Sequence, residues 1–243
     1  MALERAGTAS DEAALRAAIV AAGRRLRAAG LVAATEGNLS VRIREASLLI
    51  TPAGRRKDEL EVGDLVVAPL VPDARALGER SSGGPSPSSD VAIHRAVYAA
   101  RPDVTAVAHA HLPASMALTV AGEIPDPAAL PETALFLGRL PLVPFGEPGS
   151  EGLARRVGSV LVEGTAPRAV AVLLERHGAV AVGSGDGIAA ISSAVDRLEL
   201  VEVLCRTWRD AVLLRAARAT GLAGAEGRPG GLPGVGSASS REP

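Results

Sequence analysis

The sequence predicts a single α/β domain followed by a short tail. Segments with helical periodicity and segments of alternating apolar residues mingle along the 243-residue chain, and none reads as a linker between two domains. Hydrophobic residues make up 47% of the chain but aromatic residues only 2%, so we expect a core of alanine, valine and leucine. The domain is expected to cover residues 1–221. The glycine-, proline- and serine-rich residues 222–243 are expected to be disordered.

Charge and cysteine content argue against several classes of protein. The 26 basic and 27 acidic residues balance, which gives no electrostatic reason to expect binding to nucleic acid or to a membrane surface. No apolar run approaches the ~20 residues of a membrane helix, and the N-terminus lacks the order of a signal peptide. The single cysteine, Cys205, lies in an apolar helical pattern and is expected to be a reduced core thiol. We therefore expect a soluble cytoplasmic protein.

The first third of the chain predicts one helix and three strands. Residues 10–30 are helical, with Ser10 or Asp11 as the cap and Gly30 in the left-handed position beyond the end. The polar turn "TEGNLS" leads into an alternating strand. A second strand is expected in "SLLITPAG", and a turn of helix followed by a third strand in "DELEVGDLVVAPL".

The rest of the chain alternates helices and strands. After a loop at 76–89, "SSDVAIHRAVYAARPD" predicts a capped helix that stops before Pro102. "VTAVAHAHLPAS" predicts a strand that enters a helix, and a proline-rich connection leads to the extended, turn-rich "LGRLPLVPFGEPGS". "SEGLARRVGSVLVEG" predicts a helix, and "RAVAVLLERHGAVAVGSG" two strands that meet at His177. From Gly187 to about residue 222 the pattern is helical.

Two of the four histidines share one face of a strand. Side chains alternate along a strand, so His109 and His111 point the same way, about 6–7 Å apart, with Val107 on their face. The opposite face is expected to take Val104, Ala106 and Ala108. A His-x-His pair at a strand end is a common way to present two imidazoles to one metal ion, although exposed or hydrogen-bonded histidines give the same pattern.

Further metal-binding candidates lie elsewhere in the chain. His177 precedes Gly178, where the backbone can approach a ligand closely, although it also fits a plain turn between two strands. Asp90, at the start of a helix, is the nearest carboxylate, unless it only complements the helix dipole. His94 lies one turn later and is expected to pack under that helix. Three neutral imidazoles and a carboxylate suit Zn²⁺, with Mn²⁺, Co²⁺ or Fe²⁺ as alternatives.

Three tight turns offer backbone N–H groups and hydroxyls to an anion. They occur in "TEGNLS", "TPAG" and "PSSD", and the last one opens a helix. Such turns also occur simply to reverse the chain. The candidate groups are Thr35, Gly37, Asn38, Gly54, Ser88 and Ser89.

The ordered series "GNLS", "TPAG", "PSSD", "VAHAH", "PFGEPGSEGLA" and "RHGAVAVG" resembles the class II aldolase/adducin family over residues 11–215. The resemblance implies a three-layer α/β/α fold with a central, mostly antiparallel sheet. It also implies a homotetramer with active sites at subunit interfaces.

The same resemblance implies roles for the candidate residues. His109, His111 and His177 match metal ligands, and Asp90 matches a residue that serves both as ligand and as catalytic acid/base. The groups that match a sugar-phosphate site are Thr35, Asn38, Gly54, Ser88 and Ser89. The implied activity is that of a zinc-dependent aldolase, which cleaves a small phosphorylated ketose similar to fuculose 1-phosphate into dihydroxyacetone phosphate and an aldehyde.

Departures from the family pattern keep alternatives open. Asp90 stands where the fuculose-phosphate aldolases usually have glutamate, and aspartate there is familiar in ribulose-phosphate 4-epimerases. Ala53 removes a hydroxyl from the phosphate site, which leaves room for an unphosphorylated hydroxy acid and a decarboxylase. Tyr98, the only tyrosine, is expected in the core, and Glu132 is the nearest substitute for a second acid/base. An epimerase or dehydratase is therefore the alternative to an aldolase, and a scaffold similar to adducin, which lacks the metal ligands, is a third reading.

Overall fold

The computed structural model describes residues 9–44, 46–72, 84–164 and 168–220. Internal contacts group the chain into two units, Met1–Arg209 and Asp210–Pro243. Every site residue discussed below belongs to the first unit. The tail expected at 222–243 lies outside the described residues.

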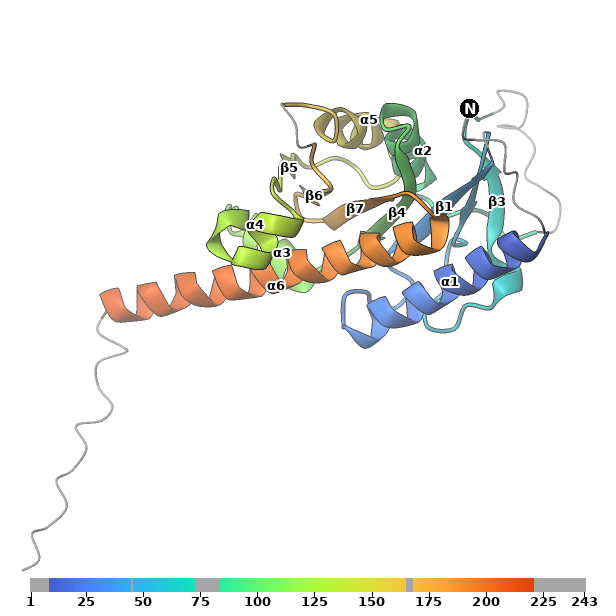
Figure 1. The fold of residues 1–243 in the computed structure, drawn as a ribbon. Helices are drawn as coiled ribbons and strands as arrows, with labels where there is room; N and C mark the ends of the chain where they lie inside the picture. Colours follow the sequence, from blue (N-terminus) through green and yellow to red (C-terminus); the bar gives the residue numbers. More distant parts are fainter. Residues whose placement is uncertain (1–8, 45, 73–83, 165–167, 221–243) are drawn as a thin grey trace, which may run out of the picture. The chain divides into compact units, whose positions relative to one another are not determined.

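The described residues form six α-helices, two short 3₁₀ turns and seven strands (Figure 1). The helices are α1 Ala9–Ala28, α2 Val91–Ala100, α3 Pro113–Val120, α4 Pro131–Phe136, α5 Glu151–Val160 and α6 Gly187–Ala219, and the 3₁₀ turns are η1 Val62–Asp64 and η2 Pro127–Ala129. The strands are β1 Asn38–Arg44, β2 Ser47–Ile50, β3 Val66–Pro69, β4 Val104–Ala110, β5 Leu142–Val143, β6 Ala171–Leu174 and β7 Gly178–Ser184.

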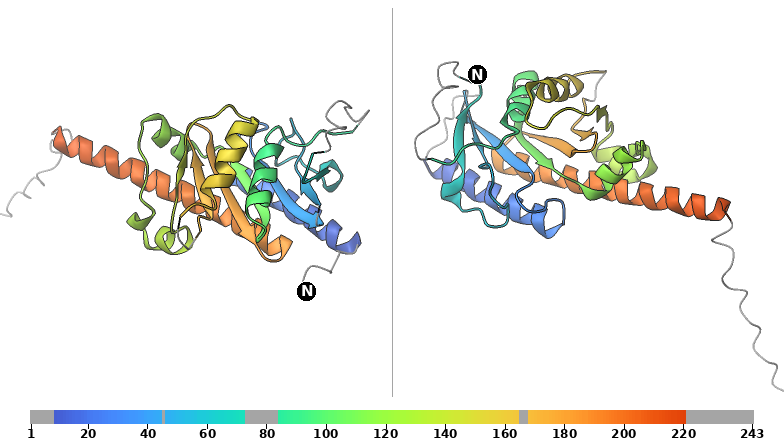
Figure 2. Two further views of the ribbon diagram at one scale, coloured as in Figure 1. Left: turned by 90° about the horizontal axis from the view of Figure 1, so that it is seen from above. Right: turned by 180° about the vertical axis from the view of Figure 1, so that it is seen from behind.

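The seven strands form one sheet in the order β3-β2-β1-β4-β7-β6-β5. All neighbouring pairs are antiparallel except β5 and β6. One apolar cluster joins the sheet to α1, α3 and α6, and a second joins its other face to α2 and α5. Figure 2 shows α2 and α5 side by side over the sheet, where they pack against each other. The three-layer α/β/α fold with a mostly antiparallel sheet is thus confirmed.

The two central strands, β4 and β7, are buried on both faces. Small side chains allow this, since Ala106, Ala108 and Ala110 face the layer of α1 and α6, and Val107 faces the layer of α2 and α5. One expectation was wrong: Val104 packs with Val107 and not with Ala106. The reason is a shift in the β4–β7 register between Val104 and Ala106, which turns Val104 to the other face.

Most of the predicted elements occur near their expected bounds. Gly30, after α1, has a φ of +71°, as its left-handed position requires. Helix α4 was not expected, because its six residues lie in a proline-rich stretch and begin at Pro131. Tyr98 and Cys205 are buried, as expected, and burial raises the pKa of the Cys205 thiol to about 12. None of the helices in the described residues is long and apolar enough to cross a bilayer.

Candidate metal centre

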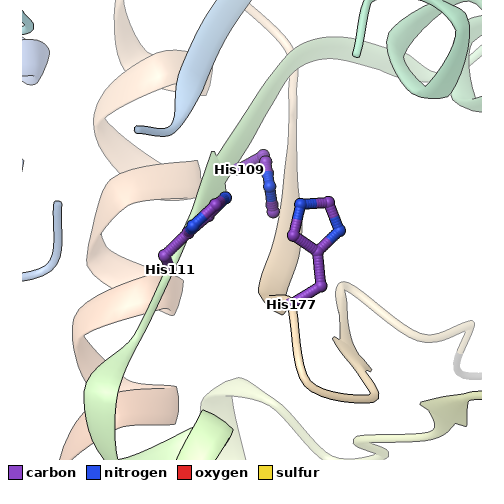
Figure 3. Close-up of side chains that lie close together, drawn as sticks. All are labelled: His109, His111 and His177. Carbon is purple, nitrogen blue, oxygen red and sulfur yellow. The ribbon is translucent and has the colours of Figure 1, made fainter. Parts of the chain in front are cut away.

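Three histidines converge at one end of the central strands. His109 lies near the end of β4, His111 follows that strand, and His177 lies in the turn between β6 and β7 (Figure 3). Their ring centroids are 4.7 to 5.0 Å apart, and one nitrogen from each ring lies within 4.8 Å of the others. Three imidazoles on rigid elements, facing one point, fit a transition-metal ion.

The hydrogen bonding of two rings tests this fit. His109 Nδ1 is 2.9 Å from the carbonyl oxygen of Ala179 and must donate to it, so the lone pair of the neutral ring is on Nε2. Both His109 Nε2 and His177 Nδ1 are buried, and no described residue offers either atom a hydrogen-bond partner. A buried unpaired nitrogen costs about 1–3 kcal/mol, a penalty that a bound cation removes. The residues therefore fit a metal ion.

The rings of His109 and His177 are neutral, as metal ligands must be. Burial and repulsion by the neighbouring histidines lower the pKa of His109 to about 3. Burial, and after it the nearby His111, also lower the pKa of His177. Near neutral pH neither ring carries the extra proton that would compete with a metal ion.

The backbone around His177 is held tightly against β4. A side chain at Gly178, where φ is +97°, would press its Cβ into the Ala110 carbonyl oxygen and place it 2.8 Å from His111 Cα. Arg176 has a φ of +59°, and its N–H donates to the Thr119 hydroxyl at 3.0 Å. Only a glycine after His177 lets the turn approach β4 closely enough to complete the cluster.

Asp90 lies beside the three histidines and is fixed by two donors. It precedes α2, and its Oδ2 is 3.9 Å from His109 Nε2. Asn38 Nδ2 donates to Oδ2 at 3.0 Å, and the backbone N–H of Gly149 donates to Oδ1 at 3.0 Å. Burial by itself raises the pKa of Asp90, but the adjacent His109 and His177 and the Asn38 hydrogen bond outweigh it, so that the pKa lies below its usual range. Asp90 is therefore an oriented carboxylate at the edge of the cluster.

A second carboxylate, Glu36, approaches from the turn before β1. Its Oε1 lies 3.6 Å from His111 Nδ1, and its Oε2 accepts a hydrogen bond from the N–H of Ala33. Sequence reasoning missed Glu36, although it stands inside the "TEGNLS" turn. It also missed the Gly149 N–H, since a backbone donor leaves no chemical signal in a sequence beyond its place in "PFGEPGSEGLA". By contrast Glu132 lines a different groove, between α4 and α6.

The predicted anion-binding turns lie next to one another. Thr51 connects them, since its N–H donates to the Leu39 carbonyl and its own carbonyl accepts from the N–H of Ser88. The Ala53 N–H likewise donates to the carbonyl of Ser86. The structure therefore brings "GNLS", "TPAG" and "PSSD" together beside Asp90.

The individual candidates in these turns differ in accessibility. Gly54, Ser89 and Thr35 are exposed, whereas Ser88 is buried and its hydroxyl accepts from the N–H of Asp90. Gly37 is buried against the His109 carbonyl, where a Cβ would lie 2.9 Å away. The Asn38 amide already has two partners inside the protein.

A family model described as the class II aldolase and adducin N-terminal domain matches residues 17–209. This range contains all the residues of the candidate centre.

Several curated proteins are similar over most of the chain. A 3-oxo-tetronate 4-phosphate decarboxylase from Cupriavidus necator is 31% identical over 203 residues, which cover 82% of this chain and 85% of that protein. A 5-methylthioribulose-1-phosphate/5-deoxyribulose-1-phosphate aldolase from Rhodospirillum rubrum is 35% identical over 197 residues, 81% of each chain. A methylthioribulose-1-phosphate dehydratase from Acidiphilium cryptum is 31% identical over 194 residues, 76% of this chain and 85% of that protein.

Among solved structures, the L-fuculose-1-phosphate aldolase of Thermus thermophilus superposes with a TM-score of 0.70 at 30% sequence identity. The superposition covers 84% of this chain and 96% of the aldolase chain.

Proposed function

The chain belongs to the class II aldolase and adducin family, and from this premise we propose that it is a metal-dependent aldolase of a small phosphorylated ketose. The observation that carries the proposal is the buried, unpaired Nε2 of His109 within the cluster formed with His111 and His177. A scaffold has no need of three converging imidazoles. The relatives named above act on phosphorylated sugars or sugar acids, which agrees with the turns gathered beside Asp90.

In this proposal His109, His111 and His177 hold a divalent ion, with zinc favoured by a ligand set of imidazoles. When bound, such an ion supplies Lewis-acid polarisation of a substrate carbonyl. Covalent catalysis through a lysine does not fit, because Lys57 is the only lysine in the sequence. It is buried, and its Nζ donates to the backbone carbonyls of Thr35 and Arg55.

Asp90 transfers the proton. The Asp90 carboxylate takes the proton of the substrate hydroxyl on the carbon that becomes the aldehyde. Cleavage of the carbon–carbon bond leaves its electron pair on the carbon next to the substrate carbonyl, and the protonated Asp90 then returns that proton to this carbon. Its two hydrogen bonds, from Asn38 and Gly149, hold the carboxylate in one orientation beside the histidines. The phosphate is proposed to bind at the exposed groups of Gly54, Ser89 and Thr35.

Metal analysis and product analysis together test the proposal. Purified protein is expected to hold about one divalent ion per chain, and the His109→Ala, His111→Ala double variant to hold none. Dihydroxyacetone phosphate should form from fuculose 1-phosphate or 5-deoxyribulose 1-phosphate. Asp90→Asn should abolish this reaction and keep the metal, whereas the matched control Glu132→Gln, in the groove between α4 and α6, should change neither. A protein that takes up no stoichiometric metal, even after zinc loading, would be a scaffold.

A second candidate is a decarboxylase of a phosphorylated 3-oxo acid. The observation in its favour is the relative from Cupriavidus necator, whose name gives that activity. Decarboxylation leaves the electron pair on the same kind of carbon as aldol cleavage, and here Asp90 would relay to that carbon a proton taken from water. Release of carbon dioxide instead of an aldehyde would identify the protein as a decarboxylase. We also propose that the protein is cytoplasmic and that it forms a homotetramer. Light scattering of the full chain tests the homotetramer.

A further inference from the structure

A series of buried polar side chains from β1 and α2 ends at the carboxylate of Asp90. It contains Asn38 and Ser40 of β1 and His94 and Tyr98 of α2. All four are at most 3% exposed. His94 is the one histidine outside the metal cluster, and the proposed reaction gives it no task.

Short contacts connect these side chains in series. Tyr98 OH is 2.8 Å from Ser40 Oγ, and Ser40 Oγ is 2.6 Å from His94 Nδ1. His94 Nε2 is 2.5 Å from Asn38 Oδ1, and Asn38 Nδ2 is 3.0 Å from Asp90 Oδ2. The series thus runs without a gap from the core to the carboxylate.

The direction of each hydrogen bond follows from the Asn38 amide. Asn38 donates from its NH₂ group to Asp90 Oδ2, so its Oδ1, which can only accept, faces His94 Nε2. His94 Nε2 must then donate, and the neutral ring accepts at Nδ1 from the Ser40 hydroxyl. Ser40 in turn accepts from Tyr98, whose hydroxyl proton is shared between Ser40 Oγ at 2.8 Å and the Thr105 carbonyl oxygen at 3.3 Å. All four bonds therefore point the same way, toward Asp90.

Both titratable members of the series are neutral. Burial lowers the pKa of His94 to about 4 and raises the pKa of Tyr98 well above its usual value. A neutral His94 with its proton on Nδ1 is excluded, because it would set the lone pairs of Nε2 and Asn38 Oδ1 against each other at 2.5 Å. The tautomer of His94 and the orientation of the Asn38 amide therefore fix each other.

We propose that His94, Ser40 and Tyr98 are positioning residues, which act through the amide of Asn38 to hold the carboxylate of Asp90 in the orientation that proton transfer requires. A reversed Asn38 amide would turn Oδ1 toward the carboxylate and the NH₂ group toward the His94 Nε2–H, which gives two repulsive contacts in place of two hydrogen bonds. The Gly149 N–H fixes the other carboxylate oxygen. The inference rests on the proposed role of Asp90 in proton transfer.

Paired substitutions of His94 test the inference by kinetics. His94→Leu removes the donor to Asn38 and should lower kcat about 10–100-fold, with KM within about twofold and the metal content unchanged. His94→Gln should restore most of the rate, because its Nε2 can still donate to Asn38. Ser40→Ala and Tyr98→Phe remove groups farther from Asp90 and should lower kcat less than His94→Leu does. The decrease should be larger for Ser40→Ala than for Tyr98→Phe. Unchanged kcat in His94→Leu, or equal losses in the Leu and Gln variants, would overturn the inference.

A buried hydroxyl outside the series provides the matched control. Thr133, in α4, is 1% exposed and donates to the backbone carbonyl of Pro127. Thr133→Val should lower thermal stability as Ser40→Ala does but leave kcat unchanged. A decrease in kcat in both variants that follows thermal stability would reduce the series to a purely structural role.

Nuclear magnetic resonance gives a readout independent of turnover. In the full chain labelled with ¹⁵N, His94 should show a protonated Nε2 and an unprotonated Nδ1 near neutral pH. The chemical shift of the Gly149 amide proton should change in His94→Leu and should be unchanged in His94→Gln and Thr133→Val. A protonated Nδ1 with a bare Nε2 would refute the inference. If His94 has the stated tautomer but no tested sugar phosphate reacts, the proposed function is wrong, whereas the hydrogen-bonded series from Tyr98 to Asp90 is supported.

Discussion

The carboxylate of Glu202, buried on α6, accepts the backbone N–H of Ala114 with both oxygens, at 3.1 and 3.2 Å. Ala114 lies in the first turn of α3, three residues after His111. Glu202 therefore caps the N-terminus of α3 and anchors the segment that carries a candidate metal ligand.

Replacing this cap should cost stability and metal affinity together. Glu202→Ala leaves the Ala114 N–H buried without an acceptor, so we expect the free energy of unfolding to fall by about 2–4 kcal/mol in urea titrations. Zinc affinity, measured with a chelating dye, should also fall. The control is Arg206→Ala, which removes the half-exposed partner of Glu202 and should cost less than about 1 kcal/mol. Equal losses in the two variants would contradict the role of the cap.

Gly178→Ala should destabilise the protein more than a substitution at an open glycine. Its Cβ would meet backbone atoms of Ala110 and His111, which cannot move without distorting β4, so a loss above about 3 kcal/mol is expected. Gly185 is the matched control, since its φ is +92° and no atom lies within 4 Å of an added Cβ. Gly185→Ala should cost only about 1 kcal/mol and leave metal binding intact. Similar unfolding midpoints for both variants would disprove the steric argument.

Glu36→Gln should weaken metal binding without unfolding the protein. The Glu36 carboxylate lies 3.6 Å from His111 Nδ1 and adds a negative charge beside the three histidines, which favours a bound cation. Loss of such a partner typically lowers metal affinity about 10–100-fold. Glu59, exposed and paired with Arg56, is a control for the loss of one negative charge. A zinc affinity of Glu36→Gln equal to that of Glu59→Gln would show that Glu36 has no such role.

The buried Lys57 predicts a pH dependence of stability. Burial lowers the pKa of its ammonium group from 10.5 to about 8. Between about pH 8 and pH 10.5 the unfolded chain therefore holds a proton that the folded chain has lost, so the free energy of unfolding rises with pH. Wild type should gain stability relative to Lys57→Met between about pH 7.5 and pH 9. Both proteins contain Cys205, so its titration cancels in the comparison. A difference in the free energy of unfolding that stays constant with pH would refute the lowered pKa of Lys57.

Patterns of side-chain chemistry predicted the fold and the histidines that lie together. Alternation placed His109 and His111 on one face, and the order of the motifs indicated a sheet of the right kind. Val104 was misplaced because a register shift leaves no mark in the residue types. Helix α4 was missed because its existence depends on packing rather than on a periodic pattern.

The environment of Asp90 shows a different limit. Sequence reasoning identified the carboxylate but not the Gly149 N–H that holds it, since any residue other than proline has such a group. His94 was expected to pack as part of the core, and it is buried. Its hydrogen bond to Asn38 depends on the distance between β1 and α2, which only the assembled layers determine.

The contact between His109 and the Ala179 carbonyl spans 70 positions of the chain, which has a consequence for biosynthesis. While the polypeptide emerges from the ribosome, the His109–His111 pair leaves the exit tunnel well before His177 and β7 do. Until β7 joins β4, nothing holds His109 in the tautomer that presents Nε2. The nascent chain therefore offers only a weak chelating pair, and strong capture of a metal ion coincides with closure of the sheet.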